Sequence, residues 1–462
     1  MRPNPIFLSL FLVALIAFVA ACGPSAQVVT TPTPPVATEG PTLPPTPAPS
    51  ATPIVSQTPL GLGTPTPIAL STPTPIGPPP TAVATPGEPG TTFGPFAVLA
   101  SFPAEGAMEV TDVAVTPGGF VAVGFGGLNG ATSYYSVRQG IVWTSVDGSN
   151  WIESVDPSLV NVEPIAVVSR GSDFFLAGYI SACSGLEESC TDVPEVGNGI
   201  WRSTNGGAWE LLAQDQGMKD GLIDDMFLAG DRLVVFGGAG EEDESTVWIS
   251  QDGVSWTSTP DLAGMDPVTS MTVGPAGFSA FGTIYDDAAF DVVLVAATSG
   301  DGAHFTYAGA PQLVGTGIDD VAAGPGGLAG VGYHTTDLFD QTGVVLHSTD
   351  GVNWTESTNN DGSFAGSALQ TVHALAGGGY VSIGYSVRDD DFGTLDGLAW
   401  YSADGSDWVL IARLDGGFST LDASALGTPG VIAFGSEQVD LPDDDVGSVI
   451  HAWFAPLASI HS

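Results

Sequence analysis

Ser145-Val-Asp-Gly-Ser-Asn-Trp151 is a seven-residue stretch that recurs, with substitutions, at six places in this chain of 462 residues. Each copy begins with Ser, carries Asp or Asn followed by Gly in its middle, and ends in an aromatic residue. The other copies are Ser203-Thr-Asn-Gly-Gly-Ala-Trp209, Ser250-Gln-Asp-Gly-Val-Ser-Trp256, Ser299-Gly-Asp-Gly-Ala-His-Phe305, Ser348-Thr-Asp-Gly-Val-Asn-Trp354 and Ser402-Ala-Asp-Gly-Ser-Asp-Trp408. Asp or Asn before Gly is typical of a hairpin turn, because the short side chain accepts backbone hydrogen bonds and Gly adopts positive φ. We therefore predict that the following residues hold hairpin turns: Asp147, Asn205, Asp252, Asp301, Asp350 and Asp404.

A second repeated element is an apolar, alternating strand that ends in Gly. Its seven occurrences are Phe120–Gly124, Phe174–Gly178, Leu233–Gly237, Phe278–Gly282, Leu328–Gly332, Tyr380–Gly384 and Val431–Gly435. The period is roughly 50 residues, which is typical of the blades of a β-propeller. In the first repeat the other three strands are predicted at Val113–Thr116, Ile141–Ser145 and Trp151–Val155. The repeat predicts an all-β, seven-bladed propeller over residues 93–462, with six blades as the alternative.

The last repeat differs from the others because it has no copy of the turn motif. After its apolar strand it offers one further strand, Val449–Phe454. The segment Phe96–Phe102, which precedes the first repeat, is a strand of similar character. We expect this segment to complete the last blade, because pairing the two ends of the chain removes the open sheet edges of a linear array.

The turn motif resembles the Asp-box, or BNR, repeat of sialidases and other secreted propellers, in a variant with one residue fewer between Asp and Gly. In that family the box is a structural element remote from any active site. The resemblance also implies that a sialidase would need three arginines to hold the substrate carboxylate. The arginines of the propeller region are Arg138, Arg170, Arg202, Arg232, Arg388 and Arg413. We expect none of them on an inner strand, so sialidase activity is not expected, and no catalytic residue is assigned.

The N-terminal 92 residues have a different character. Residues 1–21 contain one positive charge and a short apolar run, and Val19-Ala-Ala-Cys22 resembles the bacterial lipobox. The resemblance implies cleavage before Cys22 and a membrane anchor through lipid on its sulfur; the alternative is an uncleaved transmembrane anchor. Residues 22–92 are rich in Pro and Thr, which predicts an extended, disordered stalk. We expect a protein anchored outside the bacterial cytoplasmic membrane or in the cell envelope.

Charge and cysteine content narrow the possible partners. The chain has 51 acidic residues against 8 Lys and Arg, a formal net charge of −43. Such a surface repels nucleic acid, which is excluded as a partner, and the same repulsion favours a monomer. Cys183 and Cys190 lie in one polar loop of an exported chain, so we predict a disulfide between them; a metal or redox pair is the alternative.

Acidic residues also recur next to the predicted inner strand of each blade. Asp112, Asp225, Asp320 and Asp422 occupy this place, and the loops between the second and third strands are rich in Asp and Glu. Four carboxylates that converge on a central channel would suit Ca²⁺ or Mg²⁺, which prefer oxygen ligands. The alternative is that these aspartates cap turns between blades and that the loop acids are merely solvated. His373 is expected on an inner strand, as a packed core residue rather than a metal ligand.

These observations favour a binding or scaffold module over an enzyme. We expect the acidic face to bind a protein, a peptide or a neutral glycan, with Ca²⁺ as a candidate cofactor. Two alternatives remain: a divergent glycoside hydrolase that uses two carboxylates, and a factor for assembly or maintenance of the cell envelope.

Overall fold

The computed structural model describes residues 97–103, 109–127, 138–181, 197–213, 218, 221–239, 244–259, 262, 264–265, 267–286, 291–311, 313–337, 340–387, 395–418, 420–427, 430–440 and 446–456. The predicted signal peptide, Cys22, the stalk, Cys183, Cys190 and the acidic loops between second and third strands lie outside these residues. Across the described part of the chain, no helix has the length and apolar character needed to cross a membrane.

Seven separate antiparallel sheets make up the described structure, which confirms the predicted seven-bladed propeller. Blade 1 contains β2 (Glu109–Thr116), β3 (Gly119–Gly127), β4 (Arg138–Ser145) and β5 (Ile152–Val160). Blade 2 contains β6 (Val162–Arg170), β7 (Asp173–Ile180), β8 (Gly197–Ser203) and β9 (Glu210–Ala213). Blade 3 contains β10 (Leu222–Ala229), β11 (Arg232–Ala239), β12 (Glu244–Ser250) and β13 (Trp256–Thr259). Blade 4 contains β14 (Val268–Gly274), β15 (Gly277–Asp286), β16 (Asp291–Ser299) and β17 (Thr306–Tyr307).

The remaining three blades include two variations on this pattern. Blade 5 contains β18 (Thr316–Gly324), β19 (Gly327–Asp337), β20 (Asp340–Ser348) and β21 (Thr355–Glu356). Blade 6 contains β23 (Ser367–Ala374), β24 (Tyr380–Val387), β25 (Leu395–Ser402) and β26 (Asp407–Phe418), and the short β22 (Thr358–Asn359) pairs in parallel with β26. Blade 7 contains β27 (Thr420–Leu426), β28 (Gly430–Asp440), β29 (Val446–Pro456) and β1 (Ala97–Pro103).

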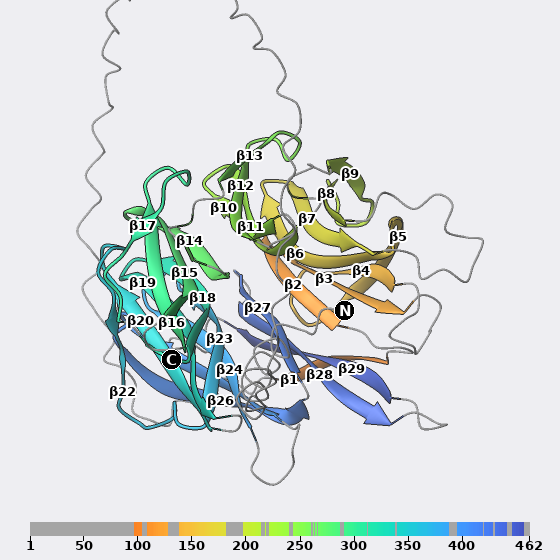
Figure 1. Cartoon of the computed structure of the whole chain (residues 1–462). Helices are drawn as coiled ribbons and strands as arrows, with labels where there is room; N and C mark the ends of the chain where they lie inside the picture. The colour runs from red at the N-terminus through yellow and green to blue at the C-terminus, as the bar shows by residue number, and fades with distance from the viewer. Residues whose placement is uncertain are drawn as a thin grey trace, which may run out of the picture. The chain divides into compact units, whose positions relative to one another are not determined.

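The first strand of each blade lies nearest the centre of the ring. Figure 1 shows β2, β6, β10, β14, β18, β23 and β27 around this centre, with β5, β9, β13 and β17 at the periphery. The inner strand of each blade also contacts the inner strand of the next blade. We call the centre of this ring the propeller axis.

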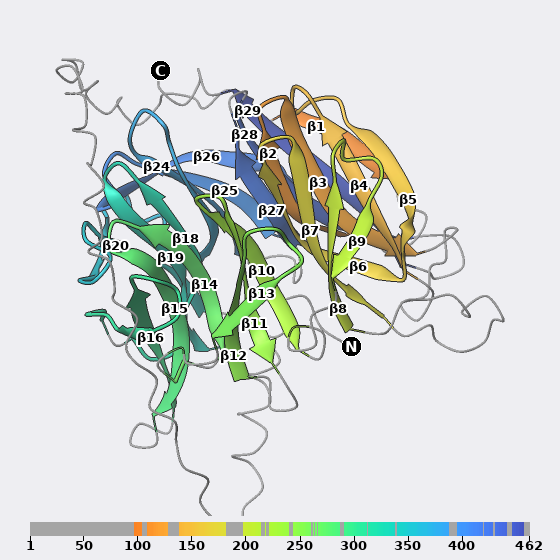
Figure 2. The same ribbon diagram turned by 90° about the horizontal axis from the view of Figure 1, so that it is seen from above.

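The two ends of the described chain meet in blade 7, as predicted. β1 pairs antiparallel with β29, from Ala97 opposite Phe454 to Pro103 opposite Val449. Figure 2 shows the orange β1 beside the blue β28 and β29. The N-terminal strand therefore supplies the outer strand that the last repeat lacks, and no neighbouring chain is needed to cover β29.

The hydrophobic core is divided into layers, most of which join one blade to its neighbour. Trp143 of β4, for example, clusters with Ile432 and Phe434 of blade 7. The same position of the third strand carries a fully buried Trp in four further blades: Trp201, Trp248, Trp400 and Trp453. Large aromatic side chains bury much apolar area, so each layer stabilises two blades at once.

Candidate functional site

The predicted hairpin turn of blade 1 is held by the side chains of Ser145 and Asp147. Asp147 Oδ1 accepts hydrogen bonds from the backbone N–H groups of Ser149 and Asn150, both at 2.8 Å. Ser145 Oγ donates to Asp147 Oδ1 at 3.3 Å and accepts from the N–H of Gly148 at 2.9 Å. Gly148 has φ of 74°, a left-handed conformation that a side chain would strain. The hydrogen bonds of this turn are thus formed between residues of the motif itself.

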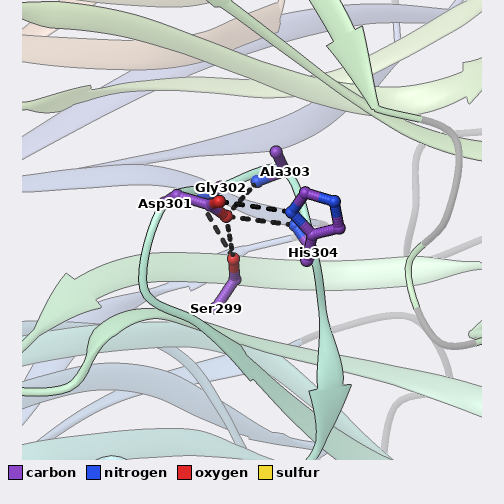
Figure 3. A network of polar contacts seen from close by, with 5 residues as sticks. All are labelled: Ser299, Asp301, Gly302, Ala303 and His304. Carbon is purple, nitrogen blue, oxygen red and sulfur yellow. Dashed lines mark hydrogen bonds and ion pairs between the residues drawn. The ribbon is translucent and has the colours of Figure 1, made fainter. Parts of the chain in front are cut away.

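The other five copies have the same geometry. Figure 3 shows the turn of blade 4, where Asp301 Oδ1 accepts from the N–H groups of Ala303 at 2.8 Å and His304 at 3.1 Å. Positive φ recurs at the central glycine of each further copy: Gly206, Gly253, Gly302, Gly351 and Gly405. In blade 2, Asn205 Oδ1 accepts from Gly207 and Ala208 in place of a carboxylate oxygen.

These turns also join neighbouring blades. A Cβ added to Gly302 of blade 4 would lie 2.6 Å from Ile249 Cδ1 of blade 3, so the turn packs closely on the preceding blade. In blade 2, the N–H of Trp209 donates to Asp156 Oδ2 of blade 1 at 3.0 Å. In blade 6, the carbonyl of Gly405 accepts from Ser357 Oγ of the preceding connection at 2.7 Å. The turns therefore link each blade to its neighbour through packing and hydrogen bonds.

Hydrogen bonding keeps the turn carboxylates ionised. The N–H and side-chain amide of Asn150 and the N–H of Ser149 lower the pKa of Asp147 to about 2. The backbone N–H of Ser255 and that of Val254 lower the pKa of Asp252 in the same way. Donors that bind the charged form stabilise it, so these groups do not give up or take a proton near neutral pH. Their chemistry suits a structural role.

The inner strands carry a second repeated feature, a β-bulge near the start of each strand. In β2, Val110 pairs with Gly124 and Asp112 pairs with Val123, which leaves Thr111 as the extra residue. The same register shift occurs in all seven inner strands. The strands also begin earlier than predicted, since β2 starts at Glu109 rather than Val113. A bulge redirects side chains locally, so adjacent residues face different surroundings.

The bulge sorts the predicted aspartates into two sets. Asp112, Asp225 and Asp320 occupy the position directly after the extra residue in β2, β10 and β18. Asp422 is instead the extra residue of β27, and its neighbour Ala423 takes the position of Asp112. Asp224 and Asp319, which the sequence analysis did not single out, are the extra residues of β10 and β18. We call these six inner-strand residues the axial aspartates.

Two axial aspartates bridge adjacent blades through backbone groups. Asp112 Oδ1 accepts from the N–H of Val113 and Oδ2 accepts from that of Val167 in blade 2, both at 2.7 Å. Asp320 repeats this arrangement with the N–H of Val321 at 2.7 Å and that of Val372 in blade 6 at 2.8 Å. The alternative that these residues cap turns between blades is thus wrong for these two, because they link inner strands.

Four of the axial aspartates, Asp112, Asp225, Asp319 and Asp320, hold protons more tightly than the turn aspartates Asp147 and Asp252. Burial raises the pKa of Asp112 to about 6 against the lowering effect of its two N–H donors, and the charge of Asp320 adds to the rise. Burial likewise raises the pKa of Asp320 to about 6. The side chain of Asp319 is exposed on one side, but protein atoms surround most of its carboxylate. This burial and the charge of Asp320 raise its pKa to about 7.

Asp225 combines burial with repulsion from several carboxylates. Burial raises its pKa well above the ordinary value, and the charges of Asp112, Asp320 and Asp224 raise it further. Asp112, Asp225 and Asp320 belong to blades 1, 3 and 5, which are not adjacent in the ring. The repulsion between these three carboxylates therefore acts across the propeller axis.

The calcium site stays a prediction. Within the ranges that the structure describes, no group of three or more His, Cys, Asp or Glu side chains is arranged to hold a metal ion. Asp112, Asp225 and Asp320 interact electrostatically, whereas Asp422 occupies a different bulge position.

Two further residues on inner strands, His373 and Arg170, make contacts with a neighbouring blade. His373 lies on inner strand β23 as predicted; its Nε2 is 2.7 Å from Ser424 Oγ of blade 7, and burial lowers its pKa to about 4. The expectation that no arginine lies on an inner strand is wrong for Arg170, the last residue of β6. Arg170 Nη1 donates to the carbonyls of Asp231 and Gln251, so it serves the packing of blades 2 and 3.

Comparisons with known proteins concern the fold alone. No protein-family model matches the chain, and no curated protein matches it. The solved structure of the polysaccharide lyase Uly1 is similar at 8% identity and a TM-score of 0.46, covering 75% of this chain and 90% of that chain. A subtype N11 neuraminidase-like protein of a flat-faced bat isolate from Peru is similar at 8% identity and a TM-score of 0.39, covering 78% and 91%. An α-L-arabinofuranosidase from Fusarium graminearum is similar at 14% identity and a TM-score of 0.38, covering 65% and 93%.

Proposed function

We propose that this propeller is a non-catalytic binding module, held at the outside of a bacterial membrane through lipid on Cys22, that binds a cationic segment of a partner protein or peptide at the propeller axis. The observation that carries the proposal is the field of the axial aspartates. Burial raises the pKa values of Asp112, Asp225, Asp319 and Asp320, and repulsion from neighbouring carboxylates adds to the rise at the first three. A Lys or Arg side chain brought to the axis would relieve this repulsion, which is a favourable term for binding.

The hydrogen bonds of Asp112 and Asp320 support binding over catalysis. Both oxygens of each carboxylate accept a backbone N–H, and those bonds fix the orientation of the side chain. A carboxylate has room for about four hydrogen bonds, so each oxygen can still accept one from a ligand. Rigid, charged acceptors suit the recognition of a cation more than proton transfer, which needs a group free to exchange its proton.

The binding proposal predicts a specific dependence on pH. The carboxyls with pKa values of about 6 and 7, Asp112, Asp320 and Asp319, lose their protons between about pH 5 and 8. The affinity of the full-length protein for a Lys- and Arg-rich peptide should therefore rise over this range at constant ionic strength. Isothermal titration calorimetry at pH 5, 6.5 and 8 measures this rise.

A charge-matched pair of variants separates the axis from the rest of the acidic surface. Asp319→Asn removes one axial charge, and Glu356→Gln removes one charge from the exposed outer strand β21. The first should weaken the peptide by about tenfold at pH 8, as expected for a lost charged hydrogen bond, and the second should leave its affinity unchanged. Equal affinities of Asp319→Asn and the unaltered protein would reject the axial site.

A divergent glycoside hydrolase is the second candidate, favoured by one observation. Asp319 and Asp320 are neighbouring carboxyls whose pKa values burial raises to about 7 and about 6, and a glycosidase uses a pair of carboxyl groups of which one has a raised pKa. Against a tyrosine nucleophile, burial raises the pKa of the nearby Tyr385, with Tyr333 and Asp319 adding to the rise. Turnover of a panel of aryl glycosides and polysaccharides, abolished in Asp319→Asn, would replace the binding proposal with this one.

The membrane anchor is tested separately, in a bacterial host. The full-length protein should fractionate with the membrane and incorporate a labelled fatty acid, whereas Cys22→Ser should do neither. A Cys22→Ser variant that keeps its label and its membrane fraction would exclude the lipid on this residue. Pull-down of partners from the parent envelope tests the alternative role in envelope assembly.

A further inference from the structure

A surface pocket on blade 6 lies outside the axial site. It has a volume of about 460 Å³, within the range of pockets that bind small molecules. Its walls come from the connection that leads from β22 to β23 and from strands β24, β25 and β26. The lining combines two charged side chains, Asp361 and Arg413, with the hydroxyl groups of Ser363, Ser367 and Ser386.

The loop that forms one wall is rigid because its polar groups are bonded to each other. Asp361 Oδ1 accepts from the N–H of Ser363 at 2.9 Å and from Asn359 Nδ2 at 2.8 Å. Ser363 Oγ accepts from the indole N–H of Trp400 at 2.9 Å, and the ring of Phe364 packs edge-on against the Trp400 ring. The wall is therefore formed before any ligand arrives, which reduces the entropy lost on binding.

The pocket contains one negative and one positive side chain, and hydrogen bonds to the surrounding protein fix the negative one, Asp361. Asp361 Oδ2 accepts from the N–H of Leu410 in β26 at 2.7 Å. With the N–H and hydroxyl of Ser363 and the amide of Asn359, four donors hold this carboxylate. Although burial raises its pKa, the hydrogen bonds of Ser363 and Leu410 lower it below the usual value, and the group stays ionised. All of its roughly four acceptor positions are thus occupied, and a ligand ammonium would compete with the Ser363 hydroxyl for one of them.

Arg413 supplies the cationic side. It lies on the outer strand β26, opposite Leu398 of β25, and its side chain is exposed. Three other arginines make contacts within the propeller: Arg170 donates to two carbonyls, Arg202 pairs with Asp173 at 2.6 Å, and Arg232 lies over the ring of Phe278. A guanidinium presents several fixed donors that match a carboxylate. In a chain with 8 basic residues, placing one of them in a pocket is informative.

We propose that this blade 6 pocket binds a small zwitterion of the amino-acid class, with the ligand ammonium at Asp361 and its carboxylate at Arg413. The Ser386 hydroxyl offers a further hydrogen bond, and Leu398 and Leu410 give an apolar surface for the aliphatic part. A purely anionic ligand would meet the Asp361 charge, and a purely cationic one would meet Arg413. Only a ligand with both charges satisfies both walls.

The test uses the full-length protein and calorimetric titration with a panel of free amino acids and dipeptides. Each positive ligand is repeated as its amide, which lacks the carboxylate, and as its N-acetyl form, which lacks the ammonium. We expect at least one panel member to bind and both of its modified forms to lose about tenfold or more in affinity, since each removes a charged hydrogen bond. A panel in which nothing binds would overturn the proposal.

Two substitutions locate the binding. Arg413→Gln should weaken the positive ligand by about tenfold, and its exposed position makes misfolding no obstacle. Arg202→Gln makes the same change of charge on blade 2 and should leave the affinity unaltered. If Arg413→Gln binds the ligand as tightly as the unaltered protein, the pocket is not its site. Asp319→Asn should not affect this ligand, which separates the outcome from that of the axial site.

Discussion

Aspartate has opposite acid strength at the outer turns and at the axis of this propeller. At the turns, Asp147 accepts from the backbone N–H groups of two following residues and from an amide, and its pKa falls to about 2. At the axis, Asp112 also accepts from two backbone N–H groups, yet burial raises its pKa to about 6. The difference is hydration: a turn carboxylate keeps water on its open side, whereas an axial carboxylate is surrounded by protein and by other carboxylates.

This contrast assigns different roles to the two regions. A carboxylate that is ionised at all ordinary pH values is a permanent acceptor, and it stabilises the turn. A carboxylate that is half protonated near pH 6 opposes folding at higher pH unless a cation compensates it. The turn carboxylates therefore stabilise the fold. The ionised carboxylates at the axis destabilise it, and such perturbed groups are typical of functional sites.

The largest predicted effect breaks a turn through its glycine. Gly302→Ala should lower the free energy of unfolding by about 2–4 kcal/mol, from the left-handed backbone and from overpacking at the blade 3 interface. Gly302 has φ of 81°, and the new Cβ would lie 2.6 Å from Ile249 Cδ1. Gly300→Ala, two residues earlier, adds the same methyl group where nothing lies within 4 Å. Denaturant unfolding of both variants measures the difference, and equal free energies of unfolding would mean that the turn does not stabilise the contact between blades 3 and 4.

A smaller loss is expected from the serine that begins a turn. Ser348 is buried, and its Oγ accepts from the N–H of Gly351 at 2.8 Å and donates to Asp350. Ser348→Ala leaves that N–H without its acceptor, which costs about 1–3 kcal/mol. The exposed neighbour Thr349→Ala should stay within about 0.5 kcal/mol of the unaltered protein. A Ser348→Ala variant as stable as Thr349→Ala would show that water replaces the hydroxyl.

Much of the fold could be predicted from the sequence because it rests on local chemistry that repeats. The turn motif specifies its own hydrogen bonds. In blades 1 to 6 the glycine of the second strand faces backbone: a Cβ at Gly124 would lie 1.9 Å from the Glu109 carbonyl oxygen. The closing strand was predictable because the last repeat visibly lacks one. The Trp shared by five third strands was an available signal that the sequence analysis did not use.

The candidate site could be predicted only in part, because it depends on register. Asp422 lies one position earlier in its strand than Asp112 does, and the residue of β27 in the position of Asp112 is Ala423. The doublets Asp224-Asp225 and Asp319-Asp320 were a hint, since two adjacent residues of a regular strand face opposite sides. The raised pKa values arise from blades far apart in sequence, and no local pattern encodes them.

The third prediction compares the two regions directly through pH. Asp225 has a folded-state pKa above its unfolded value, so its contribution to stability is present below about pH 4 and is lost as the pH rises through the folded pKa. Asp225→Asn should therefore raise the melting temperature at pH 8 and have little effect at pH 4. Asp147 has a lowered pKa, so its contribution is present at neutral pH and is lost as the pH falls towards 2.

Asp147→Asn should accordingly lower the melting temperature at pH 7 and approach the unaltered protein near pH 2. Both variants keep a side-chain acceptor, since amide and carboxylate each present an oxygen. Calorimetric scans from pH 2 to 8 at constant ionic strength measure the two profiles. Profiles that slope the same way would mean that net charge, rather than local environment, sets the acid strength of these groups.

The smallest effect concerns the one turn that lacks a carboxylate. Asn205 already accepts from the N–H groups of Gly207 and Ala208, at 2.9 Å and 3.0 Å, so Asn205→Asp needs no change of geometry. An ionised acceptor binds these donors more strongly than an amide, and we expect a small rise in melting temperature at pH 7. The rise should vanish below about pH 3, where the new carboxyl is protonated in the unfolded chain and increasingly in the folded one. A fall in melting temperature at pH 7 would instead mean that one more negative charge on a chain of net charge −43 outweighs two stronger hydrogen bonds.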